Sequence, residues 1–172
     1  MPSADLRSGA TGERRNARKT RVGTLVLTAL AVLATAVVGN LANDTDSAWY
    51  RELAKPSWQP PGPTFALVWT PLYILIAYAG ARAIDRARPG ARRGVILALA
   101  VNLVLNAGWS VVFFTFKSPE AALVEILLLN LANALLVHRA WRADRTAGIL
   151  LLPYAAWVVF ATALTGAIAW AN

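Results

Sequence analysis

Five long apolar runs divide this sequence, and each is long enough to cross a lipid bilayer. A transmembrane helix needs about 20 mostly apolar residues, because that length of α-helix covers the hydrocarbon core. The runs occupy residues 22–42, 64–84, 93–115, 119–138 and 146–170. Charged residues make up 15% of the chain, against about a quarter in typical soluble domains. The sequence therefore predicts an all-α membrane protein built as a bundle of five transmembrane helices.

The basic residues predict the orientation of this bundle. Of the 17 Lys and Arg residues, only Arg51, Lys55 and Lys117 lie in the first and third connections between runs. The others lie before the first run, or in and beside the second and fourth connections. Because cytoplasmic segments of membrane proteins are enriched in Lys and Arg, we expect a cytoplasmic N-terminus and an external C-terminus. This topology explains the net charge of +8, and we expect no nucleic acid partner.

Residues 1–21, which precede the first run, are polar and basic and show no apolar face. This composition predicts a disordered cytoplasmic tail in front of a membrane domain that spans residues 22–172. A cleaved signal peptide is the alternative interpretation of residues 1–40. It is disfavoured because the apolar run exceeds the ~7–15 residues of a signal-peptide core and is followed by a poor cleavage site.

Aromatic and polar side chains converge in the outer half of the predicted spans. These candidate site residues are Trp69 and Tyr73 in the second span, Asn106 and Trp109 in the third, and Trp157, Ala161 and Thr165 in the fifth. A pocket lined by aromatic rings with a few amides and hydroxyls, and without a cation at depth, suits a flat and largely apolar ligand. Trp141 and Trp170 fit simple anchors at the membrane surface.

Other chemistry is excluded or left open by particular residues. The chain has no cysteine and one histidine, His138, so we expect no thiolate chemistry and no multi-histidine metal site. The residues that conventional hydrolysis or phosphoryl transfer requires are also missing. Glu125 is an acid inside a span, and it either has a function or reaches the membrane surface. We expect the amides Asn102, Asn130 and Asn133 to hydrogen-bond between helices.

Four motifs give the sequence a family resemblance. WYRELAKPSWQPP, VWTPLY, LNAGWSVVFF and LLLPYAAWVVFAT occur in this order. In this respect residues 22–172 resemble the TspO/MBR family, also known as tryptophan-rich sensory proteins or translocator proteins (peripheral-type benzodiazepine receptors). Two departures from the family pattern are Ala66-Leu67, where a Gly-Pro pair is usual, and Thr165-Gly166, where Asn-Tyr is usual.

The resemblance implies a five-helix bundle, commonly a homodimer, that binds porphyrins and related tetrapyrroles and needs no further cofactor. It also implies that the connection over residues 43–63 forms a lid. By position in the motifs, the resemblance implies ligand contacts for Tyr50 and for six of the site residues given above: Trp69, Tyr73, Asn106, Trp109, Trp157 and Ala161. In the lid, KPSWQPP contributes Pro56, Trp58, Pro60 and Pro61, and its prolines restrict the shapes that the loop can adopt.

Three functions follow from this resemblance as expectations. The first is a porphyrin-binding sensor or regulator in a bacterial cell membrane, acting in tetrapyrrole or stress responses. The second is an enzyme that breaks down porphyrin in light, with Trp69 and Trp157 as electron donors. The third is a porphyrin or lipid transporter, which is disfavoured because the sequence shows no inverted repeat. The enzyme is disfavoured relative to the sensor.

Overall fold

The computed structural model describes residues 5–172, with side chains placed from Lys19 onward. Every long element in these residues is helical. The elements are α1 (Asp5–Ala42), α2 (Ala48–Glu52), α3 (Gly62–Arg86), α4 (Pro89–Ser110), the π-helical turn η1 (Val111–Thr115), α5 (Pro119–Ala143) and α6 (Arg145–Ala171).

Five helical segments are long and apolar enough to cross a membrane, which confirms the five predicted spans. They cover Lys19–Ala42, Gly62–Arg86, Pro89–Thr115, Pro119–Ala143 and Arg145–Ala171. Each contains the corresponding predicted span and extends it by a few residues, because helical hydrogen bonding continues past the last apolar side chain. The direction in which the termini face the membrane stays a prediction.

The N-terminal segment differs from the predicted disordered tail. Helix α1 begins at Asp5 and continues without a break into the first span, so residues 5–21 are helical. Arg occurs five times and Ala twice in residues 5–21, and both have high helix propensity. The span beneath it is already helical, so each further residue adds a hydrogen bond without the cost of nucleation. Residues 1–4 of the predicted tail lie outside the described residues.

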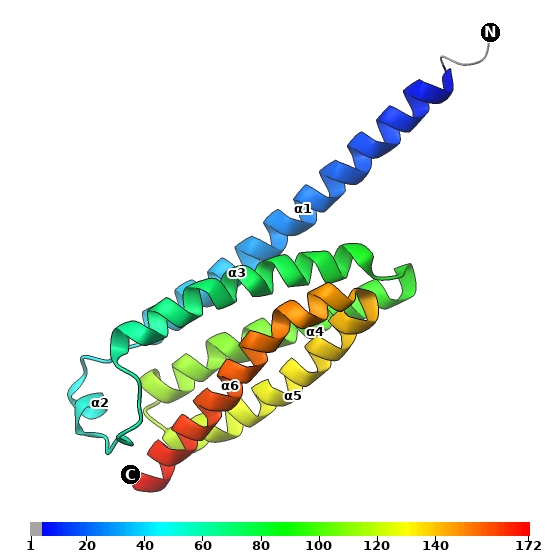
Figure 1. The fold of residues 1–172 in the computed structure, drawn as a ribbon. Helices are drawn as coiled ribbons and strands as arrows, with labels where there is room; N and C mark the ends of the chain where they lie inside the picture. The colour runs from blue at the N-terminus through cyan, green and yellow to red at the C-terminus, as the bar shows by residue number, and fades with distance from the viewer. Residues whose placement is uncertain (1–4) are drawn as a thin grey trace.

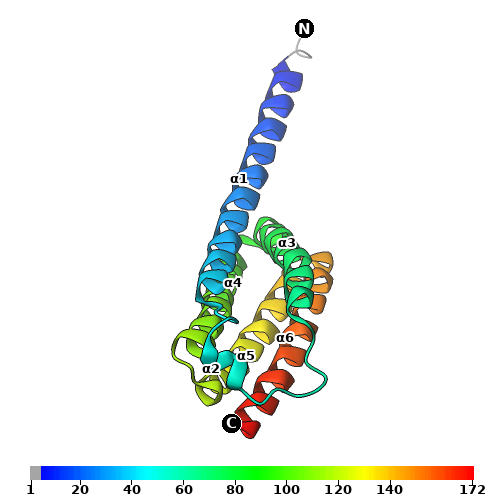
Figure 2. The same cartoon turned by 90° about the vertical axis from the view of Figure 1, so that its left-hand side faces the viewer.

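The helices form a closed ring in the order α1, α3, α6, α5, α4, with each helix in contact with the next (Figures 1 and 2). Successive long helices run in opposite directions (Figure 1). Their shared core is largely aliphatic, and Ile76, Leu151 and Leu136 are among its fully buried members. The α3–α4 and α5–α6 turns lie at the end from which α1 projects, whereas α2 and the C-terminus lie at the other end (Figure 1).

Local capping explains where two of the helices begin. Ser118 accepts a hydrogen bond from the backbone N–H of Ala121 at 3.3 Å, and Pro119 occupies the first helical position of α5. Asp144 does the same for α6, accepting from the N–H of Ala147 at 2.9 Å. Both side chains satisfy donors that have no partner inside the helix. Helix α5 thus begins at residue 119, where the fourth predicted span begins.

The first connection is more ordered than a simple loop. Residues 48–52 form the short helix α2, where Ser47 accepts a hydrogen bond from the N–H of Tyr50. The proline-rich part after α2 contains no helix, as expected, and the N–H of Gln59 closes a turn by donating to the carbonyl of Pro56. This connection runs past the ends of the bundle helices beside the C-terminus (Figure 2).

Candidate functional site

A chain of buried hydrogen bonds joins four of the five membrane helices. The Tyr73 hydroxyl (α3) donates to Asn106 Oδ1 (α4) at 3.3 Å, and Asn106 Nδ2 donates to the Tyr154 hydroxyl (α6) at 3.1 Å. Tyr154 then donates to Asn102 Oδ1 at 3.0 Å, and Asn102 Nδ2 donates to Asn133 Oδ1 (α5) at 2.7 Å. We call these five residues the central network. In an apolar interior, such a network fixes the relative positions of its helices.

An aromatic group adjoins the central network on α3 and α6. Trp69 stacks on Tyr73 with ring centroids 5.1 Å apart and an interplanar angle of 27°, and it approaches Tyr154 at 6.1 Å. One turn nearer the loop end of α3, Phe65 meets Trp157 edge to face at 5.9 Å. Trp157 in turn lies 5.1 Å from Phe160. We call these residues the α3–α6 aromatic group.

A second aromatic group lies under the first connection. Trp109 stacks on Phe113 at 5.1 Å and meets Phe114 edge to face at 6.2 Å. Trp49 and Tyr50 contact the same phenylalanines from the connection, with centroids 5.4 to 6.4 Å apart. The π-helical turn η1 supplies both Phe113 and Phe114. This second group therefore holds the connection against the end of α4.

The connection is also tied to other parts of the bundle by polar contacts. Ala54 exchanges two backbone hydrogen bonds with the Asn172 side chain, which accepts from the Ala54 N–H at 2.9 Å and donates to its carbonyl at 3.0 Å. Gln59 donates to the Tyr50 hydroxyl at 3.2 Å. The Lys55 ammonium lies 4.6 Å from the centre of the Tyr50 ring, a cation–π contact. Trp58 packs edge-on against Phe160 at 5.8 Å and stays about half exposed.

Several buried polar atoms at this end of the bundle have no hydrogen-bond partner among the described residues. They include the indole N–H of Trp109, the indole N–H of Trp157 and both carboxylate oxygens of Glu125. Glu125 faces α4, because a Cβ placed on Gly108 would lie 3.7 Å from its Oε1. Buried polar groups in native proteins are normally satisfied, so these atoms are candidate positions for a bound water molecule or a ligand.

The structure brings together some of the predicted site residues and separates others. Trp69, Tyr73 and Asn106 lie in direct succession, and Trp157 and Ala161 pack against the same core. Tyr50 and Trp109 belong to the second aromatic group, and Trp109 also packs against that core. Thr165 is buried, and its hydroxyl is bonded within its own helix to the carbonyl of Ala161 at 2.9 Å.

Within each group the rings pack against one another, and two hollows among the described residues lie elsewhere. One hollow of about 210 Å³ lies between α1 and α3 at the end opposite the first connection. Another, of about 160 Å³, lies between α4 and α5. The predicted pocket in the outer half therefore stays a prediction, and a ligand there would have to separate these aromatic side chains.

Tyr154 is the residue of the site that sequence reasoning missed. It is fully buried, and its hydroxyl bonds to two amides at the centre of the network. A signal was present, because Tyr154 precedes the predicted Trp157 by three residues and so shares its helix face. Its hydroxyl also requires a partner when buried. The predicted interhelical bonding of Asn102, Asn130 and Asn133 is confirmed, since Asn130 donates to Thr162 of α6 at 2.7 Å.

An ion pair secures the opposite end of the bundle. The Arg82 guanidinium (α3) donates two hydrogen bonds to the Asp144 carboxylate, at 2.8 and 3.0 Å. Asp144 lies in the α5–α6 turn, outside the spans, and these bonds from Arg82 lower the pKa of its carboxyl below the usual range. The same carboxylate caps α6, so one side chain joins α3 to the α5–α6 turn.

Comparisons with known proteins agree with this architecture. The model of the TspO/MBR family matches residues 25–171. A "Tryptophan-rich protein TspO" from Chlorobaculum tepidum is 38% identical over 82% of this chain and 90% of its own length. A "Tryptophan-rich sensory protein" from Cereibacter sphaeroides is 35% identical over 81% and 86% of the two chains. The human "Translocator protein" is 34% identical over 67% and 70%. With this match over nearly the whole membrane domain, the chain belongs to the TspO/MBR family.

Proposed function

We propose that this membrane protein binds a porphyrin or related tetrapyrrole at the α3–α6 aromatic group and acts as a sensor or regulator. The observation that supports this most is the stacked pair of Trp69 and Tyr73 directly beside a buried hydrogen-bond network. Stacked aromatic faces suit a flat macrocycle, and Asn106 supplies a positioned polar group at its edge. The name "sensory protein" of the Cereibacter sphaeroides relative is consistent with this role.

The unpaired indole N–H groups support the same proposal. A buried donor without an acceptor costs about 1–3 kcal/mol, which a ligand acceptor recovers on binding. Trp157 carries such a donor within the aromatic group, and Trp109 carries another beneath the first connection. A tetrapyrrole offers both a flat apolar ring and carboxylate acceptors, so it matches stacking faces and free donors together.

The first connection serves as a lid in this proposal. Tyr50 lies in contact with Phe113 and Phe114, and Gln59 bonds to its hydroxyl, so the segment lies as a cover over the helix ends. Displacing it exposes aromatic surface without unfolding a membrane helix. We also propose a homodimer as the functional unit, as the family resemblance implies.

A dark titration with protoporphyrin IX, followed by tryptophan fluorescence, tests the binding site. The double variant Trp69→Phe/Trp157→Phe should bind much more weakly than the wild type. The matched control is Trp141→Phe/Trp170→Phe, which removes two tryptophans that are exposed. This variant should bind normally. Unchanged affinity in the first variant would refute the site.

Two further arms of the same experiment separate binding from turnover and transport. Illumination of the complex should leave the pigment spectrum unchanged if the protein only binds. A new pigment product that is lost in the Trp69→Phe/Trp157→Phe variant would instead assign an enzyme. The last arm tests transport, because the human relative is named "Translocator protein". Porphyrin flux into vesicles that contain the protein, absent from empty vesicles, would instead assign transport.

A further inference from the structure

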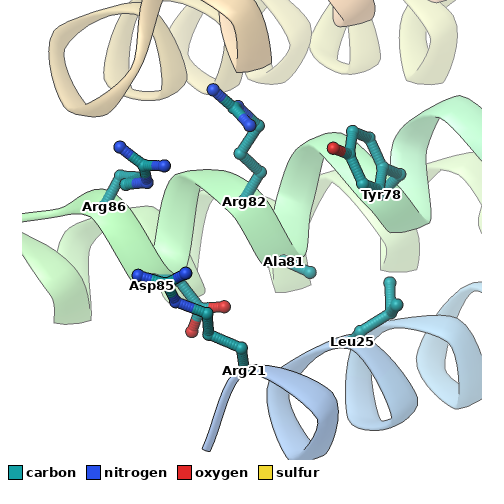
Figure 3. Close-up of a pocket in the computed structure, with 7 residues that line it drawn as sticks. All are labelled: Arg21, Leu25, Tyr78, Ala81, Arg82, Asp85 and Arg86. Carbon is teal, nitrogen blue, oxygen red and sulfur yellow. The ribbon is translucent and has the colours of Figure 1, made fainter. Parts of the chain in front are cut away.

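A charged hollow lies at the end of the bundle opposite the aromatic groups. It measures about 210 Å³ and opens between α1 and α3 (Figure 3). The residues that line it are Arg21, Leu25, Tyr78, Ala81, Arg82, Asp85 and Arg86. The charge distribution of the sequence predicts that this end faces the cytoplasm. The proposed function makes no use of this site.

The charges around the hollow are predominantly positive. Three guanidinium groups line it against one carboxylate, Asp85. Arg82 is engaged with Asp144 through two hydrogen bonds, which hold its side chain in place. In Figure 3, Arg21 extends from α1 toward Asp85 on α3, and Arg86 lies one turn from Arg82 along α3. Cationic side chains from two helices therefore contribute to the lining of the hollow.

The lining of the hollow is charged at the membrane surface and more apolar deeper in the bilayer. Arg21 and Arg86 lie at the ends of their membrane spans, Lys19–Ala42 and Gly62–Arg86. Leu25 lies four residues further along α1, roughly 6 Å deeper in the bilayer. Tyr78 lies eight residues before Arg86, roughly 12 Å deeper. A ligand that fits this gradient has an anionic head at the membrane surface and an apolar chain below it.

We propose that this hollow binds the headgroup of an anionic phospholipid. The arginine guanidinium matches phosphate oxygens in a two-point hydrogen bond, and basic pockets between membrane helices are a known setting for such headgroups. Leu25 and the ring of Tyr78 line the side along which the acyl chains descend. A free phosphate ion would use only the charged rim, so the apolar depth favours a lipid as the source of the phosphate.

The full-length chain in detergent, titrated with phosphatidylglycerol and with phosphatidylcholine, tests this site, with bound lipid counted by native mass spectrometry. The wild type should prefer phosphatidylglycerol. Arg21→Gln/Arg86→Gln should lower that preference by roughly 5-fold for each charge removed. Asp85→Asn should raise it, because it removes the one opposing charge. Arg21→Lys/Arg86→Lys keeps both charges without the two-point geometry, so it should retain more of the preference than the glutamine variant does.

The matched control is Arg92→Gln/Arg93→Gln, which removes the same charge from exposed positions at the start of α4, outside the hollow. It should leave the lipid preference unchanged. An equal loss in both double variants would overturn the proposal, because a diffuse charge effect would then explain the binding. Displacement of phosphatidylglycerol by an excess of inorganic phosphate would also overturn it, by assigning a site for soluble anions.

Discussion

Removal of the Tyr154 hydroxyl is the sharpest test of the central network. Tyr154→Phe keeps the aromatic ring, which is fully buried, and deletes only the oxygen. That oxygen accepts from Asn106 Nδ2 at 3.1 Å and donates to Asn102 Oδ1 at 3.0 Å. The substitution therefore removes two hydrogen bonds and leaves two buried amides short of a partner, while the packing volume barely changes.

The expected loss of stability follows from these two bonds. Hydrogen bonds between membrane helices contribute about 0.6 kcal/mol each on average. Loss of the two bonds of the Tyr154 hydroxyl should therefore cost at least about 1 kcal/mol. A buried group left without any partner costs about 1–3 kcal/mol. Asn102 Nδ2 keeps its bond to Asn133 and Asn106 Oδ1 keeps its bond from Tyr73, but Asn102 Oδ1 and Asn106 Nδ2 each lose the bond to Tyr154. We therefore expect Tyr154→Phe to destabilise the fold by about 1–3 kcal/mol.

Unfolding by sodium dodecyl sulfate in mixed micelles, followed by circular dichroism, measures this difference. Tyr78→Phe is the control, because Tyr78 is 47% exposed and lies outside the central network. A double-mutant cycle of Tyr154→Phe with Asn102→Ala should give a coupling above about 0.5 kcal/mol. A Tyr154→Phe variant as stable as the wild type, together with strictly additive effects in the cycle, would refute the reasoning.

Three further predictions concern other parts of the molecule. Arg82 lowers the pKa of the Asp144 carboxyl, so the ionised pair stabilises the fold above the ordinary carboxyl pKa of about 3.9 and loses this effect as the pH falls through the lowered value. Asp144→Asn should therefore lower the melting temperature at neutral pH but much less in acid. Asn172→Ala should speed hydrogen exchange at the Ala54 amide, which loses its acceptor. Glu125→Met should raise the melting temperature, because it removes two buried oxygens without partners.

Each of these predictions has its own control. Asp85→Asn, which removes a carboxylate outside that ion pair, should show no comparable change between neutral and acid pH. Asn43→Ala, at an exposed position just after α1, should leave exchange at Ala54 unchanged. Glu120→Met, at an exposed position five residues before Glu125, should not stabilise the protein. A lower melting temperature for the Glu125 variant would mean that the carboxylate has a partner in the membrane.

The membrane helices could be predicted because hydropathy alone determines them. A run of about 20 apolar residues has few alternatives to a helix in lipid, where every backbone group must be bonded internally. The start of α5 was also predictable, because Ser118 and Pro119 act on their immediate neighbours. Trp69, Tyr73 and Asn106 could be placed near one another because depth along antiparallel spans follows from the topology.

Features that depend on tertiary contacts could not be predicted in the same way. The hydroxyl of Tyr154 bonds to two amides of α4, and its place on the helix face of Trp157 could not identify these partners on another helix. The helix over residues 5–21 depends on its continuity with the first span, whereas composition alone suggested disorder. Helix α2 was not predicted within the first connection, where Ser47 caps its first turn and the Tyr50 ring contacts Phe113 and Phe114.

The π-helical turn after α4 makes the length of that segment as important as its composition. In η1 the N–H of Phe116 donates to the carbonyl of Val111, five residues earlier, at 3.0 Å. The turn thus holds one residue more than an α-helical turn, and this insertion lets the adjacent Phe113 and Phe114 both be buried. Deleting one residue would restore α-helical bonding but rotate everything after it by about 100°. One of the two phenylalanines would then lose contact with the rings of Trp49 and Tyr50. The first connection would no longer be held against the end of α4.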